Sequence, residues 1–269
     1  MSDKGNTWQT GITEIAPNAV RVRGYRVDEL MGRIGFGATV YLLATGGLPD
    51  AGAEKLMDAI LVSSVDHGAA TPSTLAARTA ASTGAPLNGA VAAGILSINE
   101  FHGGAIEACM AILRRVADLE SEDGVTASAA AERVVVDLRA TGKRVSGFGH
   151  RVHTEDPRAI RLFEIAEEVG VSGSWFARAR AVESALEAET GRALKINVDG
   201  AIAAALLEVG IPPEFGNGLF MIARLPGLVA QSLEETTTQR RMRRIDPNGV
   251  QYSGPPAQRL DQAGFVGEL

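Results

Sequence analysis

Four histidines, His67, His102, His150 and His153, are the clearest candidates for chemistry in this sequence. Three of them lie in glycine-marked segments between stretches of helical periodicity. Catalytic groups concentrate in loops held by rigid elements, whereas a histidine on an apolar helical face is usually a hydrogen-bonded core residue. For each of these histidines taken alone, a structural role is the competing interpretation.

The first glycine-rich segment is Phe101-His102-Gly103-Gly104-Ala105, in which His102 precedes a predicted helix. The two glycines let a ligand approach the backbone closely, and the first amides of a helix have no intrahelical partner. An anion or a carbonyl oxygen can bind at such a place.

The second segment is GFGHRV at 147–152, followed by Asp156-Pro157-Arg158, a cap and a proline that begin a helix carrying a cation. Its glycines do not form a dinucleotide fingerprint, because the third glycine and a parallel sheet are missing. His150 and His153 are poor metal ligands here, since Glu155 and Asp156 do not share a clear helix face with them. We therefore expect no metal.

The third segment is Asn197-Val198-Asp199-Gly200, which places a carboxylate at the start of the apolar helix predicted for 201–209. Asp199 is a candidate acid or base. The competing interpretation is a helix N-cap, a role that Asn197 or Asp199 would fill equally well.

These segments lie between predicted helices, which makes the chain all-α. Helix 28–45 ends at Gly46-Gly47-Leu48-Pro49, and helix 87–98 is so uniformly apolar that we expect it to run through the core. Only 12–22 and 143–153 look extended, too little for a substantial sheet. The other predicted helices are 50–67, 71–84, 104–120, 126–141, 157–169, 174–190, 199–210 and 213–237.

Composition excludes several classes of protein. The 269 residues carry a net charge of −6, which argues against a nucleic-acid-binding protein. No stretch approaches the ~20 apolar residues of a membrane span and no leader is apparent, so we expect a cytoplasmic protein without membrane contact. The single cysteine, Cys109, excludes an internal disulfide.

A basic cluster lies at 240–244. Taken alone, it is interpreted as a solvated helix end, since basic side chains are favoured near helix C-termini.

Taken in order, these motifs resemble the citrate synthase family. They are His67 with Arg78, FHGGA at 101–105, GFGHRVHTEDPRA at 147–159, NVDG at 197–200 and the arginine of FMIAR at 224, with VRGY at 22–25 and YLLATGGLP at 41–49. The resemblance covers nearly the whole chain. It implies a large helical domain of residues 1–104 and 212–269 and a small helical domain of residues 105–211, which close on the substrate.

The resemblance also implies roles for three catalytic residues. His102 would hold the thioester carbonyl as its enol forms, Asp199 would move the proton at the acetyl carbon, and His150 would polarise and protonate the oxaloacetate carbonyl. The same groups would run the reverse cleavage. The chemistry is sound, because a carboxylate can deprotonate an acetyl thioester only if a positioned donor stabilises the enolate oxygen.

The remaining site residues are likewise implied by resemblance. His67, Arg158 and Arg224 would bind the dicarboxylate, and a further arginine, Arg244 with Arg243 as the alternative, would come from a partner subunit. Coenzyme A, a substrate rather than a tightly bound cofactor, would contact the backbone around Val145, Gly147 and Gly149 and a cation such as Arg192 or Lys195.

Departures from the family pattern favour one branch. The chain is short between the GGLP helix end and SSVDHG, Gly200 replaces the usual aromatic residue, and Glu100 and Phe101 replace a proline and a leucine. This pattern resembles citryl-CoA lyase and the C-terminal lyase module of ATP citrate lyase. The alternatives are a citrate or 2-methylcitrate synthase and a non-catalytic CoA-binding partner of a citryl-CoA synthetase. We expect a homodimer or higher homo-oligomer, with a citryl-CoA synthetase as a further possible partner.

Overall fold

The computed structural model describes residues 8–150, 153–244 and 246–259, so Arg151 and Val152 of the GFGHRV motif and both ends of the predicted large domain lie outside the described residues. Helices dominate, which confirms the all-α prediction. They are α1 (Val27–Leu30), α2 (Phe36–Thr45), α3 (Ala51–Ser63), α4 (Pro72–Ser82), α5 (Leu87–Leu96), α6 (Ala105–Asp123), α7 (Ala127–Ala140), α8 (Pro157–Glu168), α9 (Ser174–Thr190), α10 (Val198–Glu208) and α11 (Gly216–Thr238), with 3-10 turns η1 (Pro213–Phe215) and η2 (Pro247–Gly249).

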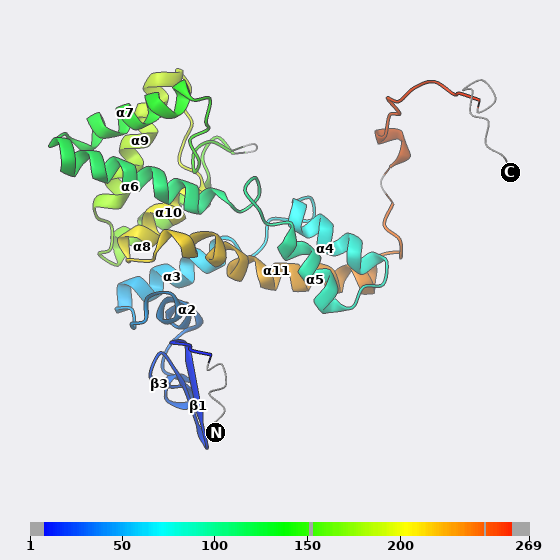
Figure 1. Ribbon diagram of the computed structural model, residues 1–269, viewed down its shortest axis with the longest axis horizontal. Helices are drawn as coiled ribbons and strands as arrows, with labels where there is room; N and C mark the ends of the chain where they lie inside the picture. Colours follow the sequence, from blue (N-terminus) through cyan, green and yellow to red (C-terminus); the bar gives the residue numbers. More distant parts are fainter. Residues whose placement is uncertain (1–7, 151–152, 245, 260–269) are drawn as a thin grey trace, which may run out of the picture.

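The extended segment predicted at 12–22 forms a small antiparallel sheet in the order β1-β2-β3. Its strands are β1 (Thr13–Ala16), β2 (Ala19–Val22) and β3 (Tyr25–Arg26), with Thr13 opposite Val22. The Arg23 guanidinium donates to the carbonyl of Leu43 at 2.8 Å, which ties the sheet to α2. This hairpin projects from the helical body at the foot of the view (Figure 1).

Two sequence predictions of local structure are wrong. The helix predicted at 28–45 divides into α1 and α2, because Gly32 adopts φ 76° and the amide of Gly35 donates to the Glu54 carboxylate of α3 at 2.9 Å. The segment from 143 to 150 is not a strand, since positive φ at Gly147 and Gly149 turns the backbone; it keeps one bridge, from Phe148 to Ile196.

The centre of the body is α10, which packs against α6, α8 and α9 (Figure 1). Every residue of α10 from Gly200 to Leu207 is buried, as its uniformly apolar sequence requires. Because small side chains line much of it, neighbouring helices approach closely. The N-terminus of α10 is therefore held by a tightly packed core, and this end carries Asp199.

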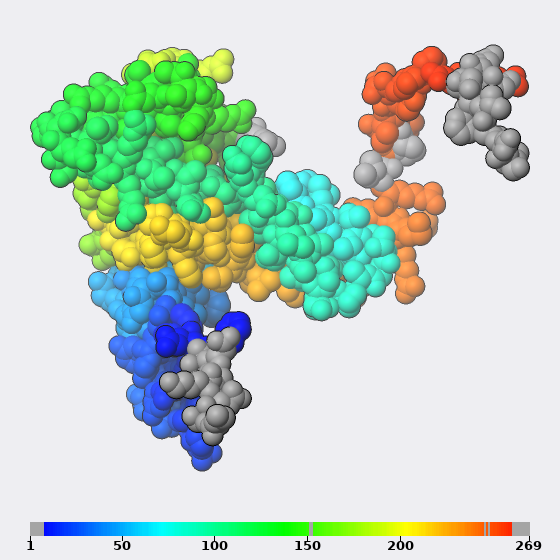
Figure 2. Space-filling model, viewed as in Figure 1, coloured from blue at the N-terminus to red at the C-terminus, as the bar shows by residue number. Residues whose placement is uncertain are grey.

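Helix α11 joins the body to an arm made with α4 and α5. It contacts α3 and α6 toward one end and α4 and α5 toward the other (Figure 1). The prediction that 87–98 runs through the core is wrong for the single chain: within α5 only Ala90 and Gly94 are buried, and Leu96 is 77% exposed. Residues 246–259 project away from the arm (Figure 2). Within the described chain, none of the helices combines the length and apolar character of a membrane span.

Candidate active site

His102 lies in a tight turn between α5 and α6, held by two backbone hydrogen bonds with Asn99 at 2.8 and 2.9 Å. Its Nε2 lies 2.8 Å from the Ser73 hydroxyl and accepts a long hydrogen bond, 3.4 Å, from the Ser73 amide at the start of α4. Because a backbone amide can only donate, we assign the ring proton to Nδ1. Burial, with the positive charge of Arg224, lowers the pKa of His102. His102 is therefore a neutral donor.

His150 follows the glycine turn and lies against two other histidines. Its ring centroid is 5.9 Å from that of His67 and 4.6 Å from that of His153. The amide of His153 donates to Nδ1 of His150 at 3.1 Å. Burial first, and then the neighbouring charge of His153, lowers the pKa of His150. Despite this cluster, no group of three or more metal-binding side chains occurs among the described residues.

His67 lies in the loop between α3 and α4, so two loops distant in sequence bring His67 and His150 together. His67 is exposed in the single chain. Partial burial lowers its pKa, and the charges of Arg158 and Arg224 act in the same direction. A ring that stays neutral beside two cations suits a hydrogen bond to an anionic ligand.

Asp199 is not the cap of α10. That role belongs to Asn197, whose side-chain oxygen accepts from the amides of Asp199 and Gly200 at 3.0 and 3.2 Å. The Asp199 carboxylate is thus left available for chemistry. Burial raises its pKa to about 6, with Asp156 adding to the effect and the two arginines, Arg158 and Arg224, opposing it. Such a carboxyl group exchanges protons readily near neutral pH.

Asp156 holds three parts of the site together, a role that its sequence motif showed only in part. Its buried carboxylate binds Arg158 in a bidentate pair at 3.0 and 2.8 Å, caps α8, and accepts from the amide of Val198 at 3.1 Å. Burial alone would raise the pKa of Asp156, but the Arg158 pair and the amides hold it below its ordinary value. The starts of α8 and α10 are therefore locked together.

Arg224 of α11 gives the clearest sign of an anionic ligand. The residue is 3% exposed, its Nε donates to the carbonyl of Ser64 at 2.9 Å, and its guanidinium lies 4.8 Å from the Phe220 ring centre. Its Nη1 is buried without a hydrogen-bond partner among the described residues. Burial lowers the pKa of Arg224. A buried guanidinium donor without a partner is costly, and a carboxylate that accepted its hydrogen bond would remove this cost.

The structure does not bring the basic cluster into this group. The backbone of Arg243 donates to the Ser82 hydroxyl at the end of α4, whereas Ser73, the partner of His102, begins that helix. Nine residues of α-helix span about 14 Å. Arg243 pairs within its own chain with Glu235, and Arg244 is exposed.

Some residues predicted to contact coenzyme A lie beside His150. A cavity of about 510 Å³ is lined by His150, His153, Gly149, Lys195 and four neighbouring residues, Thr154, Glu155, Ala193 and Leu194. The Gly147 carbonyl and the Gly149 amide are already hydrogen-bonded to Asn197 and Lys195. Three of the five candidates are not among its lining residues: Gly147, Val145, which is buried, and Arg192, which is exposed.

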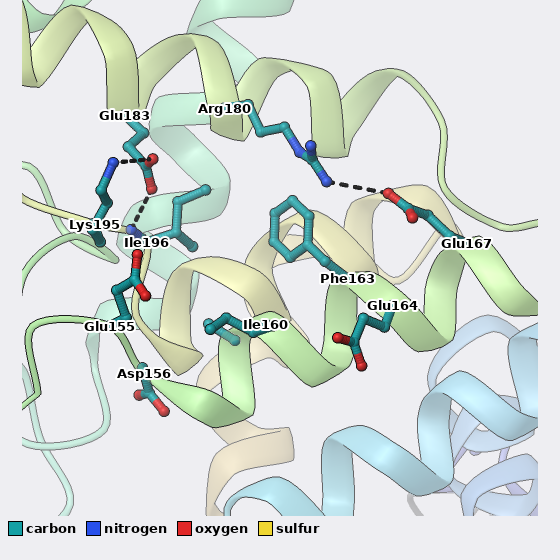
Figure 3. Close-up of a pocket in the computed structure, with 11 residues that line it drawn as sticks. Glu155, Asp156, Ile160, Phe163, Glu164, Glu167, Arg180, Glu183, Lys195 and Ile196 are labelled. Carbon is teal, nitrogen blue, oxygen red and sulfur yellow. Dashed lines mark hydrogen bonds and ion pairs between the residues drawn. The ribbon is translucent and has the colours of Figure 1, made fainter.

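A second cavity, of about 320 Å³, lies between α8 and α9 beside Lys195 (Figure 3). Ile160 and Phe163 form its apolar wall. Its two cations are paired, Lys195 with Glu183 at 3.3 Å and Arg180 with Glu167 at 3.2 Å (Figure 3). Since no histidine lines it, this cavity is not where the predicted chemistry would occur.

The contact between the glycine turn and α10 predicts a steric test. A Cβ atom at Gly200 would lie 2.3 Å from the Gly147 carbonyl oxygen, whereas one at Gly218 in α11 would meet nothing within 4 Å. Gly200→Ala should therefore destabilise the fold by about 2 kcal/mol or more, and Gly218→Ala should be neutral or stabilising. Denaturant unfolding of both variants checks this. Equal stabilities would contradict the described packing.

Comparison with known proteins identifies relatives of this chain. The family model for the citrate synthase C-terminal domain matches residues 49–245. The citrate synthase of Haloferax volcanii is 32% identical over 209 residues, 76% of this chain and 52% of that protein. The citrate/2-methylcitrate synthase of Bacillus subtilis is 32% identical over 228 residues, 82% and 57% of the two chains. The chain thus spans about half the length of the curated relatives it matches.

Solved structures show the same likeness in three dimensions. The citryl-CoA lyase of Hydrogenobacter thermophilus superposes with a TM-score of 0.87 at 38% identity, covering 96% of this chain and 99% of that one. A citrate synthase from Pyrobaculum aerophilum superposes with a TM-score of 0.63 at 29% identity, covering 86% of this chain and 56% of that one. ATP citrate lyase from Methanosaeta concilii superposes with a TM-score of 0.80 at 22% identity, covering 95% of this chain and 43% of that one. At this identity the similarity is one of fold alone.

Proposed function

This chain belongs to the citrate synthase family, and we propose that it acts there as a citryl-CoA lyase, cleaving citryl-CoA to acetyl-CoA and oxaloacetate. The observation that carries the choice is the match to the lyase structure, which extends over nearly the full length of both chains at 38% identity. The chemistry rests on His102 and Asp199, which both feel the charge of the buried and unsatisfied Arg224, and on His150, which feels that of Arg158.

In the proposed cleavage, the bond between the carbinol carbon and the CH2 group beside the thioester breaks. The hydroxyl proton passes to His150, and that oxygen becomes the ketone of oxaloacetate. The electron pair of the broken bond forms the enolate of acetyl-CoA, whose oxygen accepts a hydrogen bond from Nδ1 of His102. Protonated Asp199 then gives its proton to the CH2 carbon, forming the methyl group. Stabilisation of the enolate is the step that most needs a positioned donor.

The resting contact of His150 adds a condition to this mechanism. Because Nδ1 accepts from the His153 amide, the resting ring carries its proton on Nε2 and can donate to a ketone oxygen. Accepting a hydroxyl proton at Nε2 needs the other tautomer. We infer that binding of citryl-CoA breaks the His153 contact, freeing Nδ1 to carry the ring proton.

The same proposal assigns the binding residues. His67, Arg158 and Arg224 bind the carboxylates of the oxaloacetate portion, with Arg244 supplied by the partner subunit. Guanidinium groups match carboxylates in bidentate geometry. Gly149 and Lys195, which line the cavity beside His150, contact the coenzyme A portion, and Val145, Gly147 and Arg192 are assigned to it with them. Residues 1–104 with 212–269 form the large domain, and residues 105–211 the small domain that closes on the ligand.

A partner subunit also explains the uncovered apolar surface of the arm. Leu87 and Leu96 of α5, Leu75 of α4 and Phe101 are exposed, the last at 94%. Several large apolar side chains left exposed on one pair of helices and the adjoining loop are typical of an interaction surface. We propose that a second copy of the chain covers it.

This assembly makes a measurable prediction. Light scattering after gel filtration should give a dimer or a higher homo-oligomer, and Leu96→Glu should shift it toward monomer, because a charge would be buried without a partner. Val136→Glu, at a similarly apolar but separate exposed position on α7, serves as the matched control. A monomeric wild-type protein, or equal dissociation of both variants, would contradict the proposed interface.

Citrate synthase activity is the second candidate, favoured by the 32% identity to proteins of that name. The same three residues serve both reactions, so the functions differ in whether citryl-CoA is cleaved or its thioester hydrolysed. Purified protein supplied with citryl-CoA should release oxaloacetate, followed through malate dehydrogenase and NADH. No oxaloacetate at any protein concentration would reject the lyase proposal.

A further inference from the structure

Glu235, near the end of α11, is a buried carboxylate shared by two arginines from different parts of the chain. The residue is 2% exposed. It accepts from Nε of Arg78 on α4 at 2.7 Å and from Nε of Arg243 at 2.9 Å, with a second contact to the Arg243 guanidinium. The Arg243 hydrogen bond is the main cause that lowers the pKa of Glu235. A buried charge needs such complete pairing.

Toward the C-terminus, this carboxylate fixes the segment 239–244, which we call the C-terminal strap. Two backbone contacts accompany the ion pair: the Met242 amide donates to the Ser82 carbonyl at 2.9 Å, and the Arg243 amide donates to the Ser82 hydroxyl at 3.2 Å. With Arg243 held in this way, the next residue, Arg244, is exposed. The chain leaves α11 beside α4 at this point (Figure 1).

Toward the N-terminus, the same contacts continue to the loop that carries His67. Nη1 of Arg78 donates to the side-chain oxygen of Gln231 at 2.5 Å. The side-chain nitrogen of Gln231 donates to Asp66 at 3.1 Å, and the same Asp66 oxygen accepts from the Gly68 amide at 3.0 Å. An unbroken polar network therefore joins the strap to the residues on both sides of His67.

We propose that Glu235 is a positioning residue for substrate binding. Through this network it holds the C-terminal strap and the His67 loop in fixed positions relative to each other. By tying down Arg243, it presents Arg244 to the partner subunit. Through Arg78 and Gln231, it fixes the loop that places His67 against the dicarboxylate. This inference rests on the proposed function, and it assigns to Arg78 and Arg243 a role in positioning rather than in direct contact with substrate.

Glu235→Gln tests the proposal, with Glu234→Gln as the matched control because Glu234 is exposed and reaches Arg78 only at 3.6 Å. Glu235→Gln should accelerate hydrogen exchange of the 239–244 amides and raise KM for citryl-CoA about tenfold, with kcat nearly unchanged, since displaced binding groups weaken ligand contacts. Glu234→Gln should behave like wild type in both measurements.

Arg243→Ala is the second variant, in case loss of the buried carboxylate prevents folding; it leaves Arg78 paired with Glu235, and exposed Arg241→Ala is its control. Arg243→Ala should show the same faster exchange and higher KM. An unchanged KM in folded Arg243→Ala or Glu235→Gln overturns the inference, as does unchanged exchange. If wild type turns over no citryl-CoA, the proposed function fails, while faster exchange in the variants still supports the anchoring of the strap.

Discussion

Replacing Asp199 by asparagine should lower citryl-CoA cleavage by about a thousandfold or more, because the variant has no proton to return to the acetyl carbon. Asparagine keeps nearly the same shape, so citryl-CoA should still bind. Asp118→Asn, at an exposed position on α6, controls for the loss of a carboxylate and should retain full activity. Activity and binding are measured by steady-state kinetics and calorimetry. Turnover within tenfold of wild type would remove Asp199 from the chemistry.

The largely buried position of Asp199 makes the proposed reaction depend on pH in a defined way. Its pKa of about 6, raised by burial, means that the protonated form required for cleavage is lost as pH rises through 6. The kcat/KM for cleavage should therefore decrease above that pH, and that for condensation should decrease below it. The ionised group also costs the folded state up to roughly 3 kcal/mol once pH exceeds 6. Asp199→Asn should accordingly melt higher than wild type at pH 8 and not at pH 4.

Replacing His102 by alanine should lower cleavage by about a hundredfold to a thousandfold, through loss of the donor to the enolate oxygen. Ser73→Ala should cost less, about tenfold, because Ser73 acts only by fixing the tautomer of His102. In the double variant the Ser73 change should cost almost nothing further. Additive losses in this cycle would show that Ser73 does not work through His102, and a His102→Ala loss under threefold would reject its catalytic role.

The candidate site could be proposed from sequence because its residues stand in local motifs. Glycine-flanked histidines and a carboxylate beside an Asn cap are visible in a few consecutive residues. The partners that hold them are not, since each pairing joins distant segments: Ser73 with His102, Asp156 with Val198, and Glu235 with Arg78. No local pattern specifies such contacts.

The errors in the fold have the same physical origin. The division of α1 from α2 depends on amide contacts from Gly35 to Glu54 and from Gly37 to Asp58, made by another helix. The apolar sequence of α5 predicted burial, yet most of this helix is not buried within the single chain. The periodicity of apolar residues indicates which face of a helix is removed from water. It does not indicate whether that face packs against the same chain or against a second copy.

The stoichiometry of the products formed from citryl-CoA distinguishes a lyase from a synthase. Oxaloacetate is followed through malate dehydrogenase, and free CoA thiol through a colour reagent, in the same reaction. We expect one oxaloacetate for each citryl-CoA consumed, no free thiol, and neither product with Asp199→Asn. Free thiol and citrate without oxaloacetate would contradict it and make the protein a synthase.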